Sequence, residues 1–315
     1  MKVLITGASG MVGRNLLNHF SAREFEILAP SSKELELRDA AAVHNWLERE
    51  RPEAIVHLAA VVGGIQANID EPTRFLSANI DMAMALFNSA RRLGIKRILN
   101  VASSCMYPRD MVDPLTPDLI LTAPLEPTNE GYALSKIIGE RLLAYMVRED
   151  QNLIYRTIMP CNLYGEYDHF DLRKSHLVPA AVMKMVDAQL TSAPAVTVWG
   201  DGTARREFMF SADLADFIWW ALPKLDHLPL LLNVGTGIDY TVREYYETIG
   251  ALIGYRGKLI FDLNKPAGMK RKLLDVSVVN ALGWKALTSL ETGLLKTIEH
   301  HAQVFGLPNL AGSGT

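Results

Sequence analysis

The sequence has little cysteine, little net charge and no long apolar run. Its two cysteines, Cys105 and Cys161, form no CxxC pair, so we expect neither a disulfide framework nor a bound metal. The formal charge of -3 gives no overall field that would attract nucleic acid or an anionic membrane. No apolar segment is long enough to cross a bilayer. These absences argue against a disulfide-rich secreted scaffold, a nucleic-acid-binding protein and a membrane-spanning protein.

The remaining composition is that of a globular protein. Hydrophobic residues make up 49% and charged residues 21% of the 315 residues, enough for one large domain or two lobes around a shared site. The apolar run at the start of the chain is too short for a signal peptide. We therefore expect a cytoplasmic protein with reduced thiols. An anionic ligand would need a local cluster of Lys and Arg.

Short apolar, β-branched segments alternate with longer helical patterns through the first half of the chain. This alternation predicts an α/β fold with a Rossmann-type, doubly wound parallel sheet, because each parallel connection needs a crossover helix. Binding is then expected at the carboxyl ends of the strands. The predicted strands are Val3–Thr6, Phe25–Ala29, Ala54–Leu58, Arg97–Ala102 and Tyr155–Met159, and the predicted helices are Gly13–Ser21, Ala40–Glu50, Thr73–Leu93 and Tyr132–Arg148.

After about residue 162 the alternation weakens, and Pro and Gly punctuate the chain. We predict that residues 1–162 form the Rossmann domain, and that segments near 205–240 return to it. Residues 163–204 and 241–315 are predicted to form a smaller α/β lobe that binds the substrate.

Three glycines, Gly7, Gly10 and Gly13, form a GxxGxxG pattern between the first predicted strand and the first predicted helix. Glycine permits a tight turn and lets backbone N–H groups at the helix N-terminus approach a pyrophosphate. The pattern alone is weak, because glycine turns before helices are common, but its position after an apolar strand favours a dinucleotide site. In this fold the further cofactor contacts are expected at Met11, Val12, Asp39, Leu58, Ala59 and Ala60.

The segment after the second predicted strand, residues 29–33, contains no acid. An NAD-specific site usually places a carboxylate there to hold the ribose 2′-OH. The hydroxyl of Ser32 and the ammonium of Lys33 suit a 2′-phosphate better. The sequence therefore favours NADP, with an ordinary polar turn as the alternative.

Tyr132 and Lys136 lie four residues apart on a predicted helix, so their side chains share one face. A lysine in this position lowers the pKa of the phenol, which can then pass a proton to a carbonyl oxygen. The spacing alone also arises by chance in many helices. Ser103 and Ser104, at the carboxyl end of an earlier predicted strand, favour chemistry because a serine there can hydrogen-bond the same carbonyl oxygen.

Glycine loop, serine pair and YxxxK, in this order, resemble the extended short-chain dehydrogenase/reductase family over nearly the whole chain. Longer strings resemble the GDP-L-fucose synthases within it, which epimerise and reduce GDP-4-keto-6-deoxymannose. The strings are Ser103–Pro108, Glu126–Glu130, Asn162–Gly165, Ser175–Ala180, Val198–Thr203, Arg206–Phe208, Asn233–Gly237 and Arg271–Val276.

The resemblance implies roles for individual residues. Ser103, Tyr132 and Lys136 would form the reductase set, while Cys105 and His176 would invert C3 and C5 of the sugar. These carbons flank the C4 ketone, so their protons are acidified, and inversion needs one group on each face. The further implied cofactor contacts are Pro160, Asn162, Leu163 and His176, and the implied substrate contacts are Ser104, Asn162, Lys184, Trp199, Arg206 and Lys272.

The substrate contacts follow from the chemistry of a GDP-sugar. A diphosphate needs cations, for which Arg206, Lys184 and Lys272 are the candidates, and a guanine needs a flat surface such as Trp199. A solvated basic face and a packed tryptophan are the structural alternatives.

The chain departs from this pattern in the glycine loop, where Ala8-Ser9 stand in place of an arginine, and again at Lys184 and Ala267. The segment 171–174 differs as well. These departures leave open a single-activity reductase or epimerase acting on another GDP-4-keto-6-deoxy sugar, from a heptose or colitose pathway. An NADP-binding regulator is the alternative of another class, although regulators tend to lose the tyrosine or the lysine. By analogy, the helices near Thr73–Leu93 and Tyr132–Arg148 would pair in a homodimer.

Overall fold

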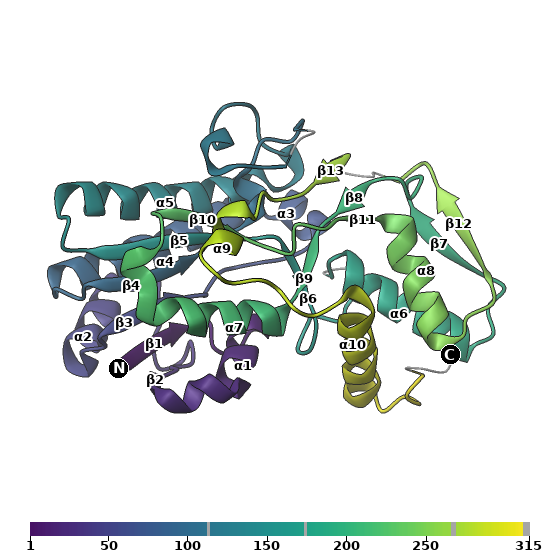
Figure 1. Ribbon diagram of the computed structural model, residues 1–315, viewed down its shortest axis with the longest axis horizontal. Coiled ribbons are helices and arrows are strands. Elements are labelled where there is room, and N and C mark those ends of the chain that lie inside the picture. The colour runs from purple at the N-terminus through teal and green to yellow at the C-terminus, as the bar shows by residue number, and fades with distance from the viewer. Residues whose placement is uncertain (112–113, 173–174, 266–268, 311–315) are drawn as a thin grey trace.

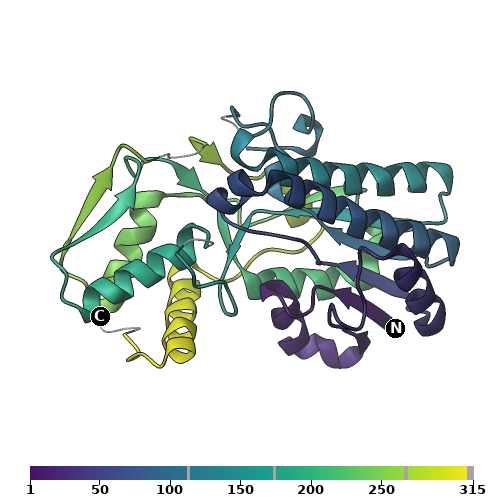
Figure 2. The ribbon, with the colours of Figure 1, turned by 180° about the vertical axis from the view of Figure 1, so that it is seen from behind.

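Two lobes of unequal size make up the computed structural model, which describes residues 1–111, 114–172, 175–265 and 269–310 (Figure 1). The larger lobe carries the N-terminus and the main sheet. The smaller lobe carries helices α6, α8 and α10 at the other end of the long axis (Figures 1 and 2). Among the described residues, no helix combines the length and the apolar character needed to span a bilayer.

The larger lobe is built on six parallel strands in the order β10-β5-β4-β3-β1-β2. The predicted doubly wound sheet is confirmed, and each predicted strand agrees with the structure within one residue at either end. The sixth strand, β10, comes from much later in the chain. The strands are β1 (Lys2–Thr6), β2 (Glu26–Leu28), β3 (Ala54–His57), β4 (Arg97–Val101), β5 (Ile154–Pro160) and β10 (Leu231–Val234).

Helices cover both faces of this sheet. On one face α4 packs between α2 and α5, and on the other α1 packs on α7. The strands are apolar on both sides because both faces are buried. Leu4 and Ile55 point into a first apolar cluster, beneath α2, α4 and α5, and Ile5 and Val56 point into a second cluster, beneath α1 and α7. The helices are α1 (Met11–Asn18), α2 (Ala40–Glu50), α3 (Ile65–Asp70), α4 (Pro72–Arg92), α5 (Glu130–Glu149), α7 (Ser211–Ala221) and α9 (Ser277–Ala281).

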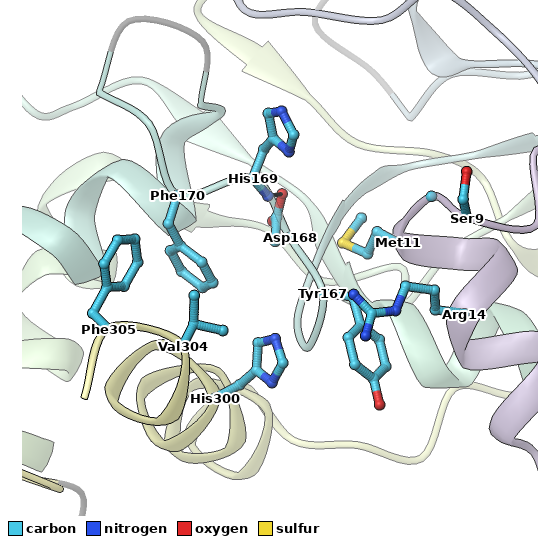
Figure 3. Close-up of a pocket in the computed structure, with 11 residues that line it drawn as sticks. Ser9, Met11, Arg14, Tyr167, Asp168, His169, Phe170, His300, Val304 and Phe305 are labelled. Carbon is cyan, nitrogen blue, oxygen red and sulfur yellow. Dashed lines mark hydrogen bonds between the residues drawn. The ribbon is translucent and has the colours of Figure 1, made fainter. Parts of the chain in front are cut away.

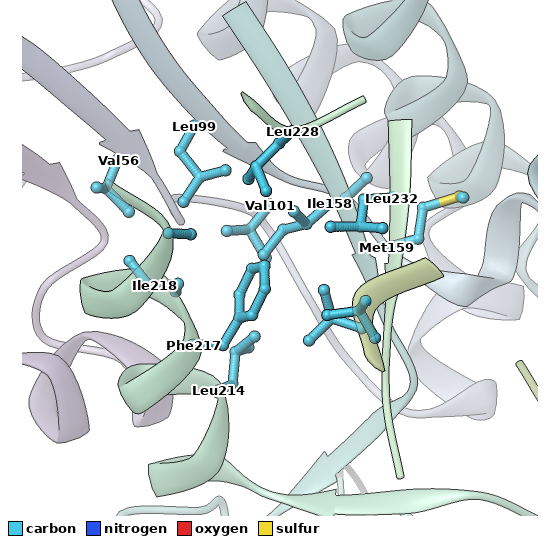
Figure 4. Packing of buried hydrophobic residues seen from close by; sticks show 14 of the residues in the cluster. Val56, Leu99, Val101, Ile158, Met159, Leu214, Phe217, Ile218, Leu228 and Leu232 are labelled. Carbon is cyan, nitrogen blue, oxygen red and sulfur yellow. The ribbon is translucent and has the colours of Figure 1, made fainter. Parts of the chain in front are cut away.

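The second cluster fixes the later segments onto the sheet. Phe217 and Leu214 of α7 lie against Val101 and Ile158 of the central strands (Figure 4). Each fully buried side chain of this size contributes roughly 2 kcal/mol to the stability of the fold.

The short 3₁₀ turns of the chain are η1 (Phe20–Glu24), η2 (Ser104–Met106), η3 (Pro117–Leu119), η4 (Pro127–Asn129) and η5 (Leu222–His227).

The smaller lobe packs three helices and small sheets around its own apolar cluster. Its strands β7 and β12 pair in parallel, and β8 lies between β11 and β13. Strands β6 and β9 pair where the chain passes between the lobes. The elements are β6 (Asn162–Tyr164), α6 (Leu177–Leu190), β7 (Ala195–Trp199), β8 (Arg205–Arg206), β9 (Phe208–Phe210), β11 (Tyr240–Thr241), α8 (Val242–Ile253), β12 (Lys258–Asp262), β13 (Arg271–Lys272) and α10 (Leu290–Phe305).

One segment differs from the boundaries drawn from the sequence. Residues near α9, placed in the substrate lobe by the sequence, pack in the core of the larger lobe through Val279 and Trp284. The indole of Trp284 donates a hydrogen bond to Asp216 of α7 (2.8 Å) and meets Phe217 edge to face. Burial of this tryptophan against α7 explains the difference, because α7 itself belongs to the larger lobe.

Candidate active site

The glycine loop is shaped by close backbone approaches. Gly7 adopts φ +71°, and a Cβ there would lie 2.7 Å from the backbone nitrogen of Ala59; a Cβ on Gly13 would lie 2.4 Å from the Cα of Ala8. Gly10 is the N-cap of α1 and offers no side-chain cap. The first N–H groups of α1 are thus left for a ligand, and Gly10 leaves space for a diphosphate to reach them. Met11 and Val12 begin this helix.

The loop after β3 is fixed beside the glycines. The hydroxyl of Thr6 accepts a hydrogen bond from Ala59 N (3.2 Å) and lies 2.8 Å from His57 Nδ1. Burial, together with the charge of Lys136, lowers the pKa of His57 to about 3, so this imidazole is neutral. Leu58, Ala59 and Ala60 are all partly buried here, at the edge where the strand order reverses between β1 and β3.

The residues predicted for the 2′-phosphate lie in an exposed turn after β2. Ser32 and Lys33 are exposed, and Ser31 donates its N–H and its hydroxyl to Glu34 (2.8 Å each). Asp39 caps α2 by accepting from the N–H groups of its first turn (3.0 Å each). This capping role was not predicted from the sequence, which had assigned Asp39 to the cofactor alone.

Ser103, Tyr132 and Lys136 meet at the carboxyl end of β4. Ser103 lies near enough to Tyr132 to lower the pKa of its phenol, and Ser103 Oγ accepts a hydrogen bond from Cys105 N (3.2 Å). Lys136 Nζ donates to the carbonyl of Val101 (3.3 Å) and lies 5.7 Å from the centre of the Tyr132 ring. The three side chains singled out by spacing therefore form one cluster.

The electrostatics of this cluster differ from the prediction. Burial raises the pKa of Tyr132 above its ordinary value, and Cys105 adds to the shift, while the Ser103 hydrogen bond opposes it. Burial also lowers the pKa of Lys136 to about 8. The predicted lowering of the phenol pKa was wrong because burial raises it, while the Lys136 ammonium donates its hydrogen bond to the carbonyl of Val101. The phenol is thus protonated at neutral pH and can donate.

The Cys105 thiol lies next to this cluster and has two polar neighbours. Asn129 Nδ2 donates to Cys105 Sγ (3.2 Å), and Lys272 Nζ lies 3.6 Å from the same sulfur. Asn129 Oδ1 is buried without a hydrogen-bond partner among the described residues. Asn129 ends η4 just before α5, so the helix that carries Tyr132 also positions the amide at the thiol.

His176 approaches from the smaller lobe. It is the N-cap of α6 and its side chain is exposed, yet the surrounding protein and then Lys272 lower the pKa of its imidazole. Lys272 on β13 is buried and pairs in register with Arg206 on β8. Lys272 thus lies close enough to act on both the thiol and the imidazole.

Two of the residues predicted for the nucleotide, Lys184 and Trp199, lie side by side in the smaller lobe. Lys184 donates to Thr197 O (3.2 Å) and lies 5.7 Å from the centre of the Trp199 ring. Lys265, which the sequence did not single out, lies 5.4 Å from the same ring. Trp199 is 53% exposed, so it has a free surface instead of packing in the core.

Three further predicted residues lie near the junction of the lobes. Pro160 ends β5, while Asn162 and Leu163 lie on β6. Asn162 Nδ2 donates to Glu207 O (3.0 Å). Ser104 is buried beneath the site and offers a substrate the least surface of the predicted set. Ala267 and residues 173–174 lie outside the described residues.

Glu207 accepts hydrogen bonds from several loops, a role that the sequence analysis did not predict. Its carboxylate is 1% exposed and accepts hydrogen bonds from the N–H groups of Thr236 (2.6 Å), Gly237 (2.8 Å) and Leu274 (2.8 Å). These donors lie after β10 and β13. The only sign of this role in the sequence is an acid placed between Arg206 and an apolar strand. The hydrogen-bond donors to Glu207 lie far from it in the sequence, so they could not be predicted.

No group of three or more His, Cys, Asp or Glu side chains that could hold a metal ion occurs within the described part of the chain. The arrangement brings a protonated phenol, a serine hydroxyl and a thiol together at the end of β4, and Lys272, which lies beside the thiol, also acts on the imidazole of His176. Such groups can polarise a carbonyl and move protons at the carbons beside it.

Comparison with known proteins defines the class. Residues 3–235 match the NAD dependent epimerase/dehydratase family, and the chain belongs to this family. It is thus an enzyme of the nicotinamide-dependent, extended short-chain type, as the sequence predicted.

Individual relatives narrow the comparison. The GDP-L-colitose synthase of Yersinia pseudotuberculosis is 47% identical over 300 residues, covering 95% of this chain and 97% of that protein. The GDP-L-fucose synthase of Azorhizobium caulinodans is 45% identical, covering 95% and 96%. The structure of a GDP-mannoheptose C4 reductase from Campylobacter jejuni with NADP bound has a TM-score of 0.86 at 26% identity, covering 95% and 98%. The predicted resemblance to GDP-L-fucose synthases is confirmed.

Proposed function

We propose that this enzyme epimerises a GDP-4-keto-6-deoxy sugar at C3 and C5 and reduces it at C4 with NADPH. The observation that carries the proposal is the meeting of two chemistries at the end of β4. The Ser103–Tyr132 pair can act on a ketone oxygen, and the Cys105 thiol beside Lys272 can act on the neighbouring carbons. A simple reductase would need only the first.

The residues that are present suit NADPH as the cofactor. The open first turn of α1 would hold the diphosphate, with Ala59 packed beside Gly7. Ser32 and Lys33, in their exposed turn, would hold the 2′-phosphate. NADPH, when bound, supplies the hydride that C4 accepts. NADP binding by the Campylobacter jejuni relative supports this assignment.

Epimerisation uses groups from both lobes. The thiolate of Cys105 removes the proton from C3 or C5, and the C–H electron pair forms an enolate whose oxygen is at C4. Ser103 and Tyr132 donate hydrogen bonds to that oxygen and stabilise its charge. His176, as imidazolium, returns a proton to the opposite face of the carbon, and its lowered pKa favours release.

Reduction follows at the same ketone. As carbon C4 accepts the hydride, Tyr132 donates its phenolic proton to the C4 oxygen. Burial keeps the phenol protonated until that step. Lys136 would hold the nicotinamide ribose and would compensate the negative charge that develops on Tyr132. Lys184, Trp199 and Arg206 hold the nucleotide end.

A narrower activity is the second candidate. The 47% identity to a GDP-L-colitose synthase favours a 3-deoxy substrate, in which C3 is a methylene and only C5 is a stereocentre that can be inverted. The same thiol and imidazole would then act at one carbon. The NADP-binding regulator loses support, because the Tyr132–Lys136 pair and the thiol are all in place.

Product analysis by NMR tests these alternatives. The protein is incubated with NADPH in deuterated water and offered GDP-4-keto-6-deoxymannose or its 3-deoxy analogue. We expect deuterium at C3 and C5 of a reduced 6-deoxy product. Deuterium at C5 alone with preference for the analogue would establish the narrower activity, and absence of NADPH oxidation with both sugars would contradict the proposal.

We also expect a cytoplasmic homodimer in which α4 and α5 of one protomer meet those of its partner. The two helices pack side by side within the chain, and their outer surface exposes Met84, Ile138 and Tyr145. Sedimentation of the protein, with Ile138→Glu as the test variant, checks this. A wild-type protein that sediments as a monomer would contradict it.

A further inference from the structure

The sulfur of Cys105 accepts hydrogen bonds from two side chains that come from different lobes. Asn129 Nδ2 donates over 3.2 Å and Lys272 Nζ over 3.6 Å. Asn129 ends η4 in the larger lobe, whereas Lys272 lies on β13 in the smaller lobe. Among the described residues, the sulfur donates no hydrogen bond in return. Two donors and no acceptor form the surroundings that suit a thiolate, which can only accept.

The Asn129 amide meets the sulfur through its nitrogen and leaves its oxygen unpaired. Asn129 Oδ1 is buried without a hydrogen-bond partner in the described part of the chain. A buried acceptor of this kind destabilises a protein, and native structures contain few of them. In the opposite orientation the oxygen would face the sulfur and accept the S–H hydrogen of a neutral thiol. The orientation that is found therefore favours the ionised sulfur.

The charged and titratable groups around the sulfur come from three elements. Lys272 of β13 is buried, so solvent screens its charge little. Tyr132 of α5 lies close enough for the charge of Cys105 to raise the pKa of its phenol, while Lys136 of the same helix bonds a backbone carbonyl. His176, before α6, has its pKa lowered by burial and then by Lys272. The ammonium of Lys272 is thus the positive charge in contact with the sulfur.

We propose that Asn129 and Lys272 are positioning residues which together hold Cys105 as a thiolate, and that Lys272 serves the sulfur instead of the substrate diphosphate. The thiol gives its proton to solvent, and the thiolate then takes the proton of the sugar C–H bond. A hydrogen bond to a charged acceptor is roughly twice as strong as one to a neutral acceptor, so both contacts favour ionisation. Arg206, in register with Lys272, remains the candidate for the diphosphate. This role rests on the proposed function, in which the thiolate is the base.

Alkylation of the thiol tests the proposal without substrate or cofactor. The measurements use the full chain with Cys161→Ser, in which Cys105 is the one cysteine left of the two. Only the thiolate reacts with iodoacetamide, and ordinary thiols are ionised at about pH 10. The rate at about pH 7 divided by the rate at about pH 10 therefore gives the thiolate fraction, corrected for differences in access.

Two variants and a control follow that fraction. Lys272→Met keeps the length of the side chain but removes the charge, and the thiolate fraction should fall roughly tenfold. Asn129→Asp keeps the shape of the amide but replaces the donor with a negative charge, so the fraction should also fall roughly tenfold. Arg14→Met removes a cation that lies 3.9 Å over the ring of Tyr167, in the wall of the cavity between α1 and α10 (Figure 3). This control should leave the fraction unchanged.

Substrate measurements separate the proposed role from a role in binding. In Lys272→Met at saturating substrate, exchange of the sugar protons with deuterated solvent should fall roughly tenfold at about pH 7 and recover by about pH 9, because the higher pH restores the thiolate. GDP should bind this variant as it binds the wild type. Lys184→Met, at a cation that we assign to the nucleotide, should show the opposite pattern, with weaker GDP binding and an unchanged thiolate fraction.

The thiolate fraction decides the proposal. If the fractions of Lys272→Met and Asn129→Asp equalled that of Arg14→Met, the two donors would not hold the thiolate, and the proposal would be overturned. Weaker GDP binding by Lys272→Met with an unchanged fraction would return this lysine to the diphosphate, as the sequence predicts. The proposed function fails by a different result, normal proton exchange in Cys105→Ser, which leaves the alkylation measurements intact.

Discussion

The two lobes hold their functional side chains by different means. In the larger lobe Tyr132 stands on a helix of 20 residues, and Ser103 follows a central strand, both backed by the buried clusters on the sheet. In the smaller lobe Lys272 and Arg206 stand on strands of two residues each. Strands this short are not stable by themselves.

A buried carboxylate compensates for the short strands. Glu207, next to Arg206 in the chain, accepts backbone hydrogen bonds from segments after β10 and β13, and one of them is Leu274 N, two residues beyond Lys272. Tyr132, the proposed proton donor, is therefore positioned by apolar packing, whereas Lys272, the cation beside the thiol, is positioned by polar contacts. We therefore expect substitutions in the two regions to have different effects on activity and on stability.

The largest expected effect concerns the packed region. Tyr132→Phe removes the only group that we assign as proton donor to the C4 oxygen, so the rate of NADPH-dependent reduction should fall about a thousandfold. Because the ring and its packing remain, NADPH affinity and thermal stability should change little. Stopped-flow measurement of NADPH oxidation, with a fluorescence titration of the cofactor, checks both statements.

Tyr155→Phe is the matched control for this variant. Tyr155 is also buried on the sheet, and its hydroxyl donates to Ile95 O (2.7 Å). Its loss should lower the free energy of unfolding by about 1 kcal/mol and leave reduction intact. Normal reduction by Tyr132→Phe would remove the phenol from the mechanism.

The second effect lies at the junction of the lobes. Cys105→Ser keeps the shape of the side chain but removes the thiolate, so exchange of the sugar protons with solvent should fall roughly a hundredfold or more. Cofactor binding should be unaffected. NMR detection of deuterium at C3 and C5 measures the exchange, and Cys161→Ser, at a buried cysteine, should exchange normally. Exchange at the wild-type rate in Cys105→Ser would show that the thiol is not the base.

The sequence predicts the packed region better than the junction. Every predicted strand of the sheet was found within one residue, because short apolar runs separated by helical patterns leave few alternatives. Tyr132, Lys136 and Ser103 were found for the same reason: their spacing places them at one edge of a parallel sheet. These are consequences of local periodicity, which a single sequence contains.

What the sequence could not supply depends on burial and on long-range contacts. Asn129 was read only as part of a motif string, and its contact with Cys105 needs the turn of η4. The pKa of Tyr132 was predicted in the wrong direction because spacing reveals neither the burial that raises it nor the bond from Lys136 to Val101 O. The donors to Glu207 likewise come from segments that only the fold brings together.

The third effect tests the polar contacts of the smaller lobe. Glu207→Ala leaves three buried N–H groups without acceptors, which should lower the free energy of unfolding by about 3–5 kcal/mol. Glu207→Gln keeps one acceptor oxygen and should cost about half as much. Urea unfolding followed by circular dichroism measures both.

Glu247→Ala on α8 is the control for Glu207. Its partner Arg243 lies 3.8 Å away, and both side chains are about half exposed. An ion pair of this kind contributes about 0.5 kcal/mol or less. If Glu207→Ala were no less stable than Glu247→Ala, the carboxylate would not hold the lobe together, and the contrast between the two regions would fail.

The smallest effect should be a gain of stability in the packed region. The pKa of Lys136 falls from 10.5 to about 8 on burial, so the folded state binds its proton less tightly than the unfolded chain does. The resulting destabilisation is complete below about pH 8 and disappears above about pH 10.5. It amounts to about 3 kcal/mol at pH 7, of which the lost bond to Val101 O offsets about 1 kcal/mol. Lys136→Met should therefore unfold at higher urea concentration than the wild type at pH 7 and lose this advantage by about pH 10, while reduction is impaired. A variant less stable than the wild type at pH 7 would mean that the buried ammonium, like the carboxylate of Glu207, is part of what holds its region together.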